Sequence, residues 1–136
     1  MFLIKVEVRE SAIDGKGVFT LQEIKKGDVI WKFDPTHDKF LLPAEFKALD
    51  DVSKEALLPV AYLSRVTNRW VYPPENDPAR FTNHSKENNL SAIFKTEISE
   101  ELIFFANRDI PVDEELTNDY NEFDDLTPKD LKADWR

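Results

Sequence analysis

The chain has 136 residues, the size of one folded domain, and 41% of them are hydrophobic, including ten Phe, three Trp and three Tyr. This composition predicts a packed core and differs from that of a disordered chain. The absence of cysteine excludes disulfides, thiolate zinc sites and cysteine nucleophiles. The two histidines, His37 and His84, are too few to predict a histidine-based metal cluster, so no metal site is expected.

Charge is distributed unevenly along the chain. The formal net charge is −9, from 18 basic and 27 acidic side chains, and residues 113–136 hold nine acidic side chains against three basic ones. This balance disfavours direct nucleic-acid binding and favours a basic protein partner, although acidic tails also serve solubility alone. No apolar run is long enough to cross a membrane and no signal-peptide pattern is present, which predicts a soluble, intracellular protein, cytoplasmic or nuclear.

The N-terminal region predicts a small β unit. Residues 6–9 alternate valines with charged residues, the two-residue period of a half-buried strand. Residues 14–17 (DGKG) predict a tight turn because glycine accepts positive φ, and the strand pattern resumes at residues 18–20. A second turn at residues 25–28 precedes the apolar, β-prone residues 29–33.

Residues 36–78 have a different character. Residues 43–49 predict a helix that begins with proline. Residues 53–58 are a second helix candidate, which Pro59 either limits to a turn or kinks. Residues 69–72 are more strand-like, and a proline-rich loop follows them.

The C-terminal part predicts further strands and one helix. Residues 90–94 and 102–106 are apolar and β-prone, and the polar linker 97–101 between them predicts a hairpin. Residues 125–131 contain a threonine cap followed by proline, which predicts a C-terminal helix. The sequence therefore predicts one mainly β domain over residues 1–136, with a short helical insert and a C-terminal helix.

Two polar segments differ from ordinary strands or helices. Residues 79–85 read ARFTNHS, a polar turn that follows an aromatic, and residues 114–120 read EELTNDY, a short β-like run that ends in an acid and a tyrosine. Together they resemble the paired signature of the SET domain, the fold of most protein-lysine methyltransferases. A third segment, GKGVF at residues 15–19, resembles that family's G-x-G cofactor-binding turn. The positions that match the paired signature are Arg80, Phe81, Asn83, His84, Ser85, Asn89, Glu114, Glu115, Leu116, Thr117, Asp119 and Tyr120.

The resemblance implies a β-clip fold, in which several short sheets surround a pseudoknot formed by the two signature segments. Residues 36–78 lie where the family has a variable insert that shapes the substrate groove, and residues 121–136 correspond to a post-SET-like segment. The implied activity is transfer of a methyl group from S-adenosyl-L-methionine to a lysine side chain of a protein. The acidic tail favours a basic substrate segment, such as a histone-like or ribosomal tail.

Methyl transfer to lysine needs in-line positioning, a neutral amine and exclusion of water, and it needs no metal. By its match to the motif, Tyr120 is the predicted catalytic residue, because its hydroxyl can orient the amine lone pair. The cofactor-binding residues that the resemblance implies are Lys16, Gly17, Asn83, His84 and Tyr120. Taken singly, each also has a structural interpretation, such as a hairpin glycine, an Asx-type turn or a half-buried tyrosine.

An aromatic wall around the target lysine is also implied. The substrate-channel residues expected are Tyr62, Trp70, Tyr72, Asn118 and Phe123. Trp135 in the tail is a further candidate, and core packing is the alternative role for each of these aromatics.

The chain departs from the family pattern in several places. Lys86 and Asn88 replace a Cys and a Pro, the tail lacks the cysteines of a zinc-bound post-SET element, and Asn118 stands where many relatives have a Tyr or Phe that tunes the number of methyl groups. These departures keep a second interpretation open, a SET-like module that binds a basic protein without turnover. A carboxylate-pair hydrolase using Glu115 and Asp119 is a third, weakly supported because acids are abundant throughout the chain.

Overall fold

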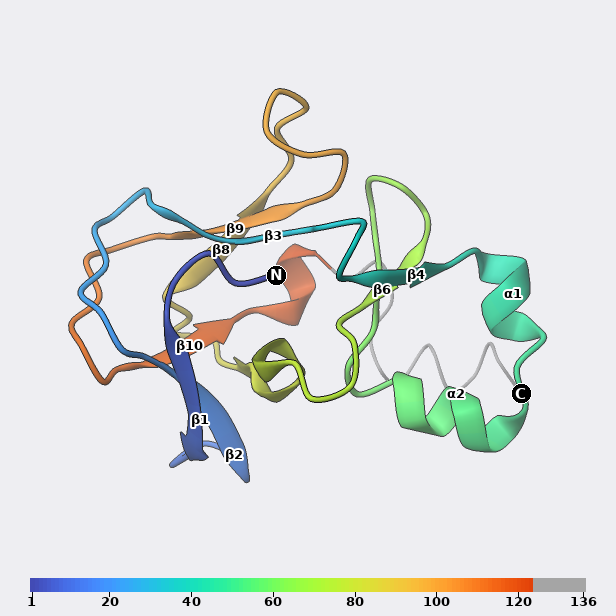
Figure 1. Ribbon diagram of the computed structural model, residues 1–136, viewed down its shortest axis with the longest axis horizontal. Helices are drawn as coiled ribbons and strands as arrows, with labels where there is room; N and C mark the ends of the chain where they lie inside the picture. The colour runs from blue at the N-terminus through green and yellow to red at the C-terminus, as the bar shows by residue number, and fades with distance from the viewer. Residues whose placement is uncertain (124–136) are drawn as a thin grey trace.

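The computed structural model describes residues 1–123, in which three small sheets are accompanied by short helices (Figure 1). The four-stranded sheet has the order β1 (Val6–Glu10), β2 (Lys16–Thr20), β10 (Glu115–Asn118), β7 (Asn83–His84). The two three-stranded sheets have the orders β3 (Val29–Lys32), β9 (Ile103–Ala106), β8 (Leu90–Ile93) and β4 (Lys39–Leu41), β6 (Trp70–Tyr72), β5 (Tyr62–Leu63). The helices are α1 (Pro43–Lys47), α2 (Asp51–Leu57) and the 3-10 helices η1 (Pro78–Phe81) and η2 (Tyr120–Glu122).

The mainly β fold class predicted from the sequence is confirmed. None of the helices in the described part of the chain is long and apolar enough to cross a membrane. The predicted C-terminal helix at residues 125–131 and the candidate Trp135 lie outside the described residues.

β1 and β2 form the antiparallel hairpin that the alternating pattern predicts. Glu10 lies opposite Lys16, and Gly15 in the connecting turn has φ of +46°, which glycine adopts without a steric cost. The turn is closed by a hydrogen bond of 2.8 Å from the Ser11 amide to the Gly15 carbonyl. The hairpin therefore holds residues 14–17 at one end of the four-stranded sheet.

β10 lies between β2 and β7, antiparallel to the first and parallel to the second. Thr117 lies opposite Asn83 and Asn118 opposite His84, and the Ser85 amide donates to the Asn118 carbonyl at 2.9 Å. The segment expected to be a polar turn is thus partly a short strand. Its pairing brings the two signature segments side by side, although more than thirty residues separate them in the sequence.

Asn89 fixes the chain just beyond this pairing. Its side chain is buried, and its Nδ2 donates to the Glu115 carbonyl and to Glu114 Oε2, both at 2.8 Å. Its Oδ1 accepts from the Thr117 amide at 2.9 Å. A primary amide has both donors and an acceptor, so one side chain satisfies polar groups on two sides. Asn89 therefore locks β10 against the segment that leads into β8.

β8 and β9 form the predicted hairpin, with Leu90 opposite Ala106 and Ile93 opposite Ile103, and β3 pairs with the other edge of β9. This sheet packs against the four-stranded sheet through the first core cluster. The fully buried members of that cluster are Val18, Ile24, Ile30, Leu90, Ala106, Ile110 and Leu116. A second, largely aromatic cluster joins the same sheet to β5, β6 and η2. Its buried members are Trp31, Phe33, Tyr62, Val71, Leu102, Phe104 and Phe123.

Both helices predicted within residues 36–78 are present and lie with β4 and β6 at one end of the molecule (Figure 1). Phe46 of α1 stacks on Trp70 of β6, with ring centroids 4.2 Å apart and an interplanar angle of 18°. β4 and β5 were not predicted, because neither of these short strands shows a clear alternating pattern.

The polar linker 97–101 is not wholly exposed to solvent, because Glu101 is fully buried. Its Oε2 accepts from the Thr67 hydroxyl at 2.6 Å, its Oε1 accepts from the Ser64 hydroxyl, and the Arg69 guanidinium lies 3.6 Å away. A buried carboxylate requires such partners. Glu101 therefore joins the β8–β9 hairpin to the chain around β5.

Asp50 caps α2, and its contribution to stability is expected to depend on pH. Its Oδ1 accepts from the Ser53 amide at 2.7 Å, and this backbone hydrogen bond, with help from the Ser53 side chain, lowers the pKa of Asp50 from 3.8. Because the folded-state pKa is the lower one, the stabilisation is present above about pH 3.8 and is lost as the pH falls through the folded-state value. Melting temperatures measured against pH should show Asp50→Ala less stable than the parent above this range and equal to it in strong acid. Asp50→Asn, which keeps a neutral acceptor, should remove the pH dependence of the difference; an Asp50→Ala deficit that persists unchanged in acid would contradict this account.

Candidate active site

A cavity of about 250 Å³ opens beside the end of β10 and the start of η2. Its wall is mostly apolar and is built by all three sheets and by the turn at residues 58–61. No acidic side chain of the described residues lines it. Within residues 1–123, the polar side chains that line it are Tyr62, Arg80, Thr82, Asn118 and Tyr120. Such a cavity favours an apolar or neutral group over a charged one.

Tyr120 lies where β10 ends and η2 begins. Its hydroxyl donates to the Thr82 carbonyl at 3.2 Å, and its ring lies edge-on to Phe123 with centroids 5.8 Å apart. The hydroxyl donates its proton to a carbonyl, so its oxygen keeps lone pairs that can accept from another group. The structure therefore places a fixed phenol oxygen at the cavity wall.

His84 positions Tyr120 from the neighbouring strand. The Tyr120 amide donates to His84 Nδ1 at 3.1 Å, and the two rings lie 4.9 Å apart. Because Nδ1 accepts this bond, the proton of the neutral imidazole is on Nε2. Asp119 Oδ1 lies 3.7 Å from the same Nδ1 atom. His84 thus has a structural contact with the predicted catalytic residue, whether or not it also meets a cofactor.

Gly17 lies directly against a hydrogen-bonded network between β2, β7 and β10. A Cβ at Gly17 would lie 2.2 Å from Glu115 Oε2 and 3.2 Å from Asn83 Nδ2. Asn83 Nδ2 lies 2.9 Å from Glu115 Oε2 and 3.0 Å from the Lys16 carbonyl, and the Ser11 hydroxyl donates to Glu115 Oε1 at 2.7 Å. The expected close approach at Gly17 is therefore made by side chains of this chain. The network holds the Gly-Lys-Gly turn beside the Asn-His-Ser segment, while the Lys16 side chain is exposed.

Asn118 lines the cavity and carries an unsatisfied polar atom. The residue is 9% exposed, and its Oδ1 is buried without a hydrogen-bond partner in the described structure. A buried amide oxygen normally has a donor, so the Asn118 oxygen is available to accept a hydrogen bond from a ligand or a water molecule. The oxygen belongs to a wall that Tyr120 also forms.

The predicted aromatic residues divide into two groups. Tyr62 and Phe123 line the cavity, with ring centroids 5.1 Å apart in an edge-on arrangement. Trp70 and Tyr72 do not line it: Trp70 stacks on Phe46 in a separate core cluster, and Tyr72 packs against that cluster. Alternate residues of a strand face opposite sides, but the sequence does not show which side of β6 faces the cavity.

Several wall residues were not predicted at all. Sequence reasoning missed Phe2, Trp31, Leu58, Ala61, Ala79 and Phe104. They come from separate elements and share no motif, so only the tertiary structure reveals them. Arg80, whose Nε donates to the Pro74 carbonyl at 2.9 Å, also lines the cavity while holding η1 to the preceding loop.

The structure gives Glu115 and Asp119 separate structural roles. Both oxygens of Glu115 take part in the network beneath Gly17, and Asp119 Oδ1 accepts from the Asn121 amide at 3.0 Å as the cap of η2. Neither residue lines the cavity. The arrangement therefore does not favour the carboxylate-pair hydrolase.

Comparison with known proteins agrees with this geometry. A family model described as SET domain matches residues 15–121. The chain is 31% identical over 120 residues to a histone-lysine N-methyltransferase, H3 lysine-4 specific, of Neurospora crassa; the match covers 85% of this chain and 9% of that protein. The crystal structure of a Plasmodium falciparum "putative histone methyltransferase" superposes with a TM-score of 0.59 at 22% identity, covering 86% of this chain and 93% of the other. This chain thus spans about a tenth of the Neurospora protein, and the match lies in the domain described above. The chain belongs to the SET domain family.

Proposed function

We propose that this protein is an S-adenosylmethionine-dependent methyltransferase that acts on lysine side chains of a protein. The observation that carries the proposal is the apolar cavity whose wall holds the Tyr120 hydroxyl and the unpartnered Asn118 Oδ1. The family match and the methyltransferase named among its relatives support the same activity.

The cavity wall can present oxygen atoms to the methyl group of a donor bound next to it. The wall offers two oxygen acceptors, Asn118 Oδ1 and the Tyr120 hydroxyl. Among the described residues, no acidic side chain lines the wall, so none competes with the lysine for the methyl group or holds the donor in its ground state. S-adenosylmethionine, when bound, supplies an electrophilic methyl group on a positively charged sulfur. We expect Lys16, Gly17, Asn83 and His84 to hold the donor next to the cavity: none of the four lines it, but Asn83 Nδ2 donates to the Lys16 carbonyl across β10, and His84 contacts Tyr120 on the cavity wall.

The chain's own residues would prepare the lysine for reaction. An apolar wall disfavours the charged ammonium and so lowers the pKa of a lysine that enters the cavity. The Tyr120 oxygen, fixed by its bond to the Thr82 carbonyl and by ring contacts with Phe123 and His84, can then orient the neutral amine. Tyr62 and Phe123 exclude water from the same space.

We further propose that the substrate segment is basic. The support is the net charge of −9, with acidic residues concentrated towards the end of the chain, and the histone methyltransferase activity named for the Neurospora relative. Charge attraction between an acidic enzyme and a Lys/Arg-rich segment raises the encounter rate and weakens as salt is added.

The test is transfer of labelled methyl from S-adenosylmethionine to a panel of histone and ribosomal proteins at low and high ionic strength. We expect label on lysine and a rate that falls as the salt concentration rises. Transfer that is indifferent to salt and to basic flanking residues would contradict the basic substrate. Cofactor binding with no label on any protein of the panel would instead support the non-catalytic binding module.

A further inference from the structure

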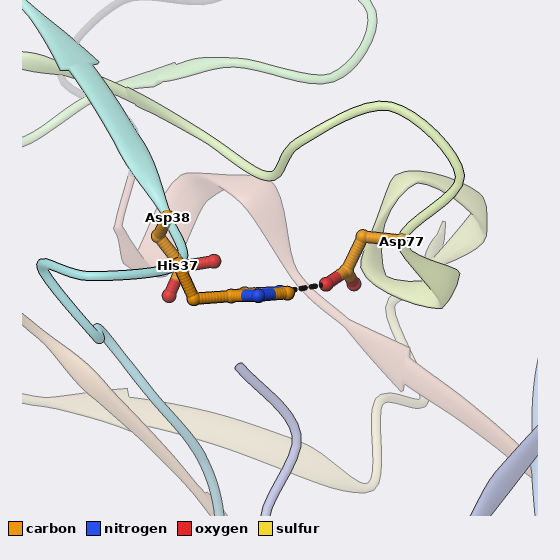
Figure 2. Close-up of side chains that lie close together, drawn as sticks. All are labelled: His37, Asp38 and Asp77. Atoms are coloured by element: carbon orange, nitrogen blue, oxygen red, sulfur yellow. Dashed lines mark hydrogen bonds and ion pairs between the residues drawn. The ribbon is translucent and has the colours of Figure 1, made fainter.

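A second cluster of polar side chains lies outside the cavity wall, where the turn between β3 and β4 meets the start of η1. It consists of His37, Asp38 and Asp77, each of which offers one ligand atom, and these atoms lie within 4.8 Å of one another. Figure 2 shows the His37 ring reaching across to the Asp77 carboxylate, with the Asp38 carboxylate near the other end of the His37 side chain. None of the three residues lines the cavity described above.

Backbone groups hold both carboxylates in place. Asp77 Oδ1 accepts from the Ala79 amide at 2.8 Å, which leaves Oδ2 facing His37 Nε2. Asp38 Oδ2 accepts from the Asp34 amide at 2.8 Å. In each carboxylate one oxygen is oriented by the main chain; the other oxygen pairs with His37 in Asp77 and has no hydrogen-bond partner in Asp38 within the described structure. Metal-ligating carboxylates are commonly oriented by outer hydrogen bonds of this kind.

The second oxygen of Asp38 is the independent sign of a missing partner. The Asp38 side chain is completely buried, yet its Oδ1 has no hydrogen-bond partner in the described structure. Leaving a buried carboxylate oxygen unsatisfied is costly. The Met1 amino group lies 2.8 Å from the opposite oxygen, Oδ2, so it does not satisfy Oδ1.

From this geometry we infer that His37, Asp38 and Asp77 form a binding site for a divalent transition-metal ion, and that zinc is the ion the ligands fit best. One imidazole nitrogen and two carboxylate oxygens match the ligands of zinc, whereas magnesium and calcium prefer oxygen alone. Two buried carboxylates also supply the negative charge that a divalent cation requires. The expectation of no metal site was based on the number of histidines and did not consider a mixed His–Asp site.

The place of the site suggests what the ion does. Asp77 caps η1, whose residues Ala79 and Arg80 line the cavity and which leads directly to Thr82 and β7. His37 and Asp38 belong to the turn that follows β3. The ion would therefore join two segments that are about forty positions apart and steady the entry to the signature segment. This role is structural and does not depend on the proposed methyl transfer.

The first experiment follows the two histidines of the intact chain by nitrogen-15 NMR of the imidazole rings during titration with zinc chloride at neutral pH. We expect the His37 signals to shift and to saturate at one ion per chain, with the His84 signals unchanged. Because no substitution is needed, the result does not depend on the folding of a variant. A shift of His84 in place of His37, or no saturable shift, would overturn the inference. The second of these results is expected if His37 and Asp77 only form a hydrogen-bonded pair.

Calorimetry and thermal unfolding with zinc chloride then identify the ligands. His37→Gln and Asp38→Asn should each weaken zinc binding by at least about tenfold and should remove the zinc-dependent rise in melting temperature. Glu55→Gln, an exposed site on α2 that changes the net charge by as much as Asp38→Asn, serves as the matched control and should bind zinc like the parent. Equal zinc affinity in the parent and both ligand variants would overturn the site, whatever the methyltransferase assay shows.

Discussion

Tyr120→Phe is expected to lower the rate constant of methyl transfer by at least about 100-fold while leaving the affinity for S-adenosylmethionine within about twofold of the parent value. The substitution removes only the oxygen that is fixed at the cavity wall by the Thr82 carbonyl, and it keeps the ring that packs on His84 and Phe123. Single-turnover transfer to a protein substrate, together with calorimetric titration of the cofactor, measures both quantities.

Tyr72→Phe is the matched control for this prediction. It removes the same atom from a tyrosine that packs against the Phe46–Trp70 cluster and does not line the cavity. We expect its transfer rate to stay within about threefold of the parent rate. Equal losses in the two variants would show that the Tyr120 hydroxyl has no special role, and a fully active Tyr120→Phe would refute the assignment of Tyr120 as the catalytic residue.

Asn89→Ala is expected to give the largest loss of stability among single polar substitutions in the signature segments, about 3 kcal/mol. The substitution leaves the Thr117 amide and the Glu115 carbonyl without their partners beside β10, and Asn89 is only 2% exposed, so water replaces these bonds poorly. Urea unfolding followed by circular dichroism measures the change in unfolding free energy.

Asn88→Ala provides a comparison at the neighbouring position. The Asn88 amide donates to the Leu90 carbonyl at 2.8 Å and to the Glu122 carboxylate, but it accepts no backbone bond from β10. We expect a loss of about 1 kcal/mol. A loss at Asn89 no greater than that at Asn88 would contradict the view that Asn89 locks the paired segments.

Local patterns in the sequence predicted the parts of the fold that have local causes. The β1–β2 hairpin follows from alternating valines and a glycine turn, and α1 follows from a proline at its first position. The β8–β9 hairpin follows from two apolar runs with a turn between them. Each signal lies within about ten residues of the element it specifies, so propensity and period suffice.

Features that depend on long-range contacts were not predictable in this way. Glu101 looks like a linker residue, and only its approach to Ser64 and Thr67 explains its burial. Trp70 and Tyr72 were expected in the substrate channel, but the orientation of β6 places them with Phe46. An aromatic side chain serves a core and a channel equally well, so the sequence does not distinguish the two.

The candidate site could be predicted only because the sequence resembles that of the SET domain family. Residue chemistry alone does not separate Tyr120 from an ordinary half-buried tyrosine. The parallel pairing of β7 with β10 puts Tyr120 beside His84 and Asn118 on the cavity wall. The unpartnered oxygens of Asn118 and Asp38 had no signal in the sequence, because an unsatisfied atom is a property of the folded surroundings.

The most direct test of the central claim is mass spectrometry of a histone substrate after incubation with the purified protein and S-adenosylmethionine. Methylation predicts a mass increase by whole methyl groups, and fragmentation should place these groups on lysine side chains, with none in the reaction that contains Tyr120→Phe. Purified protein that binds S-adenosylmethionine but adds no methyl group to any basic protein, or that methylates a residue other than lysine, would contradict the proposed function.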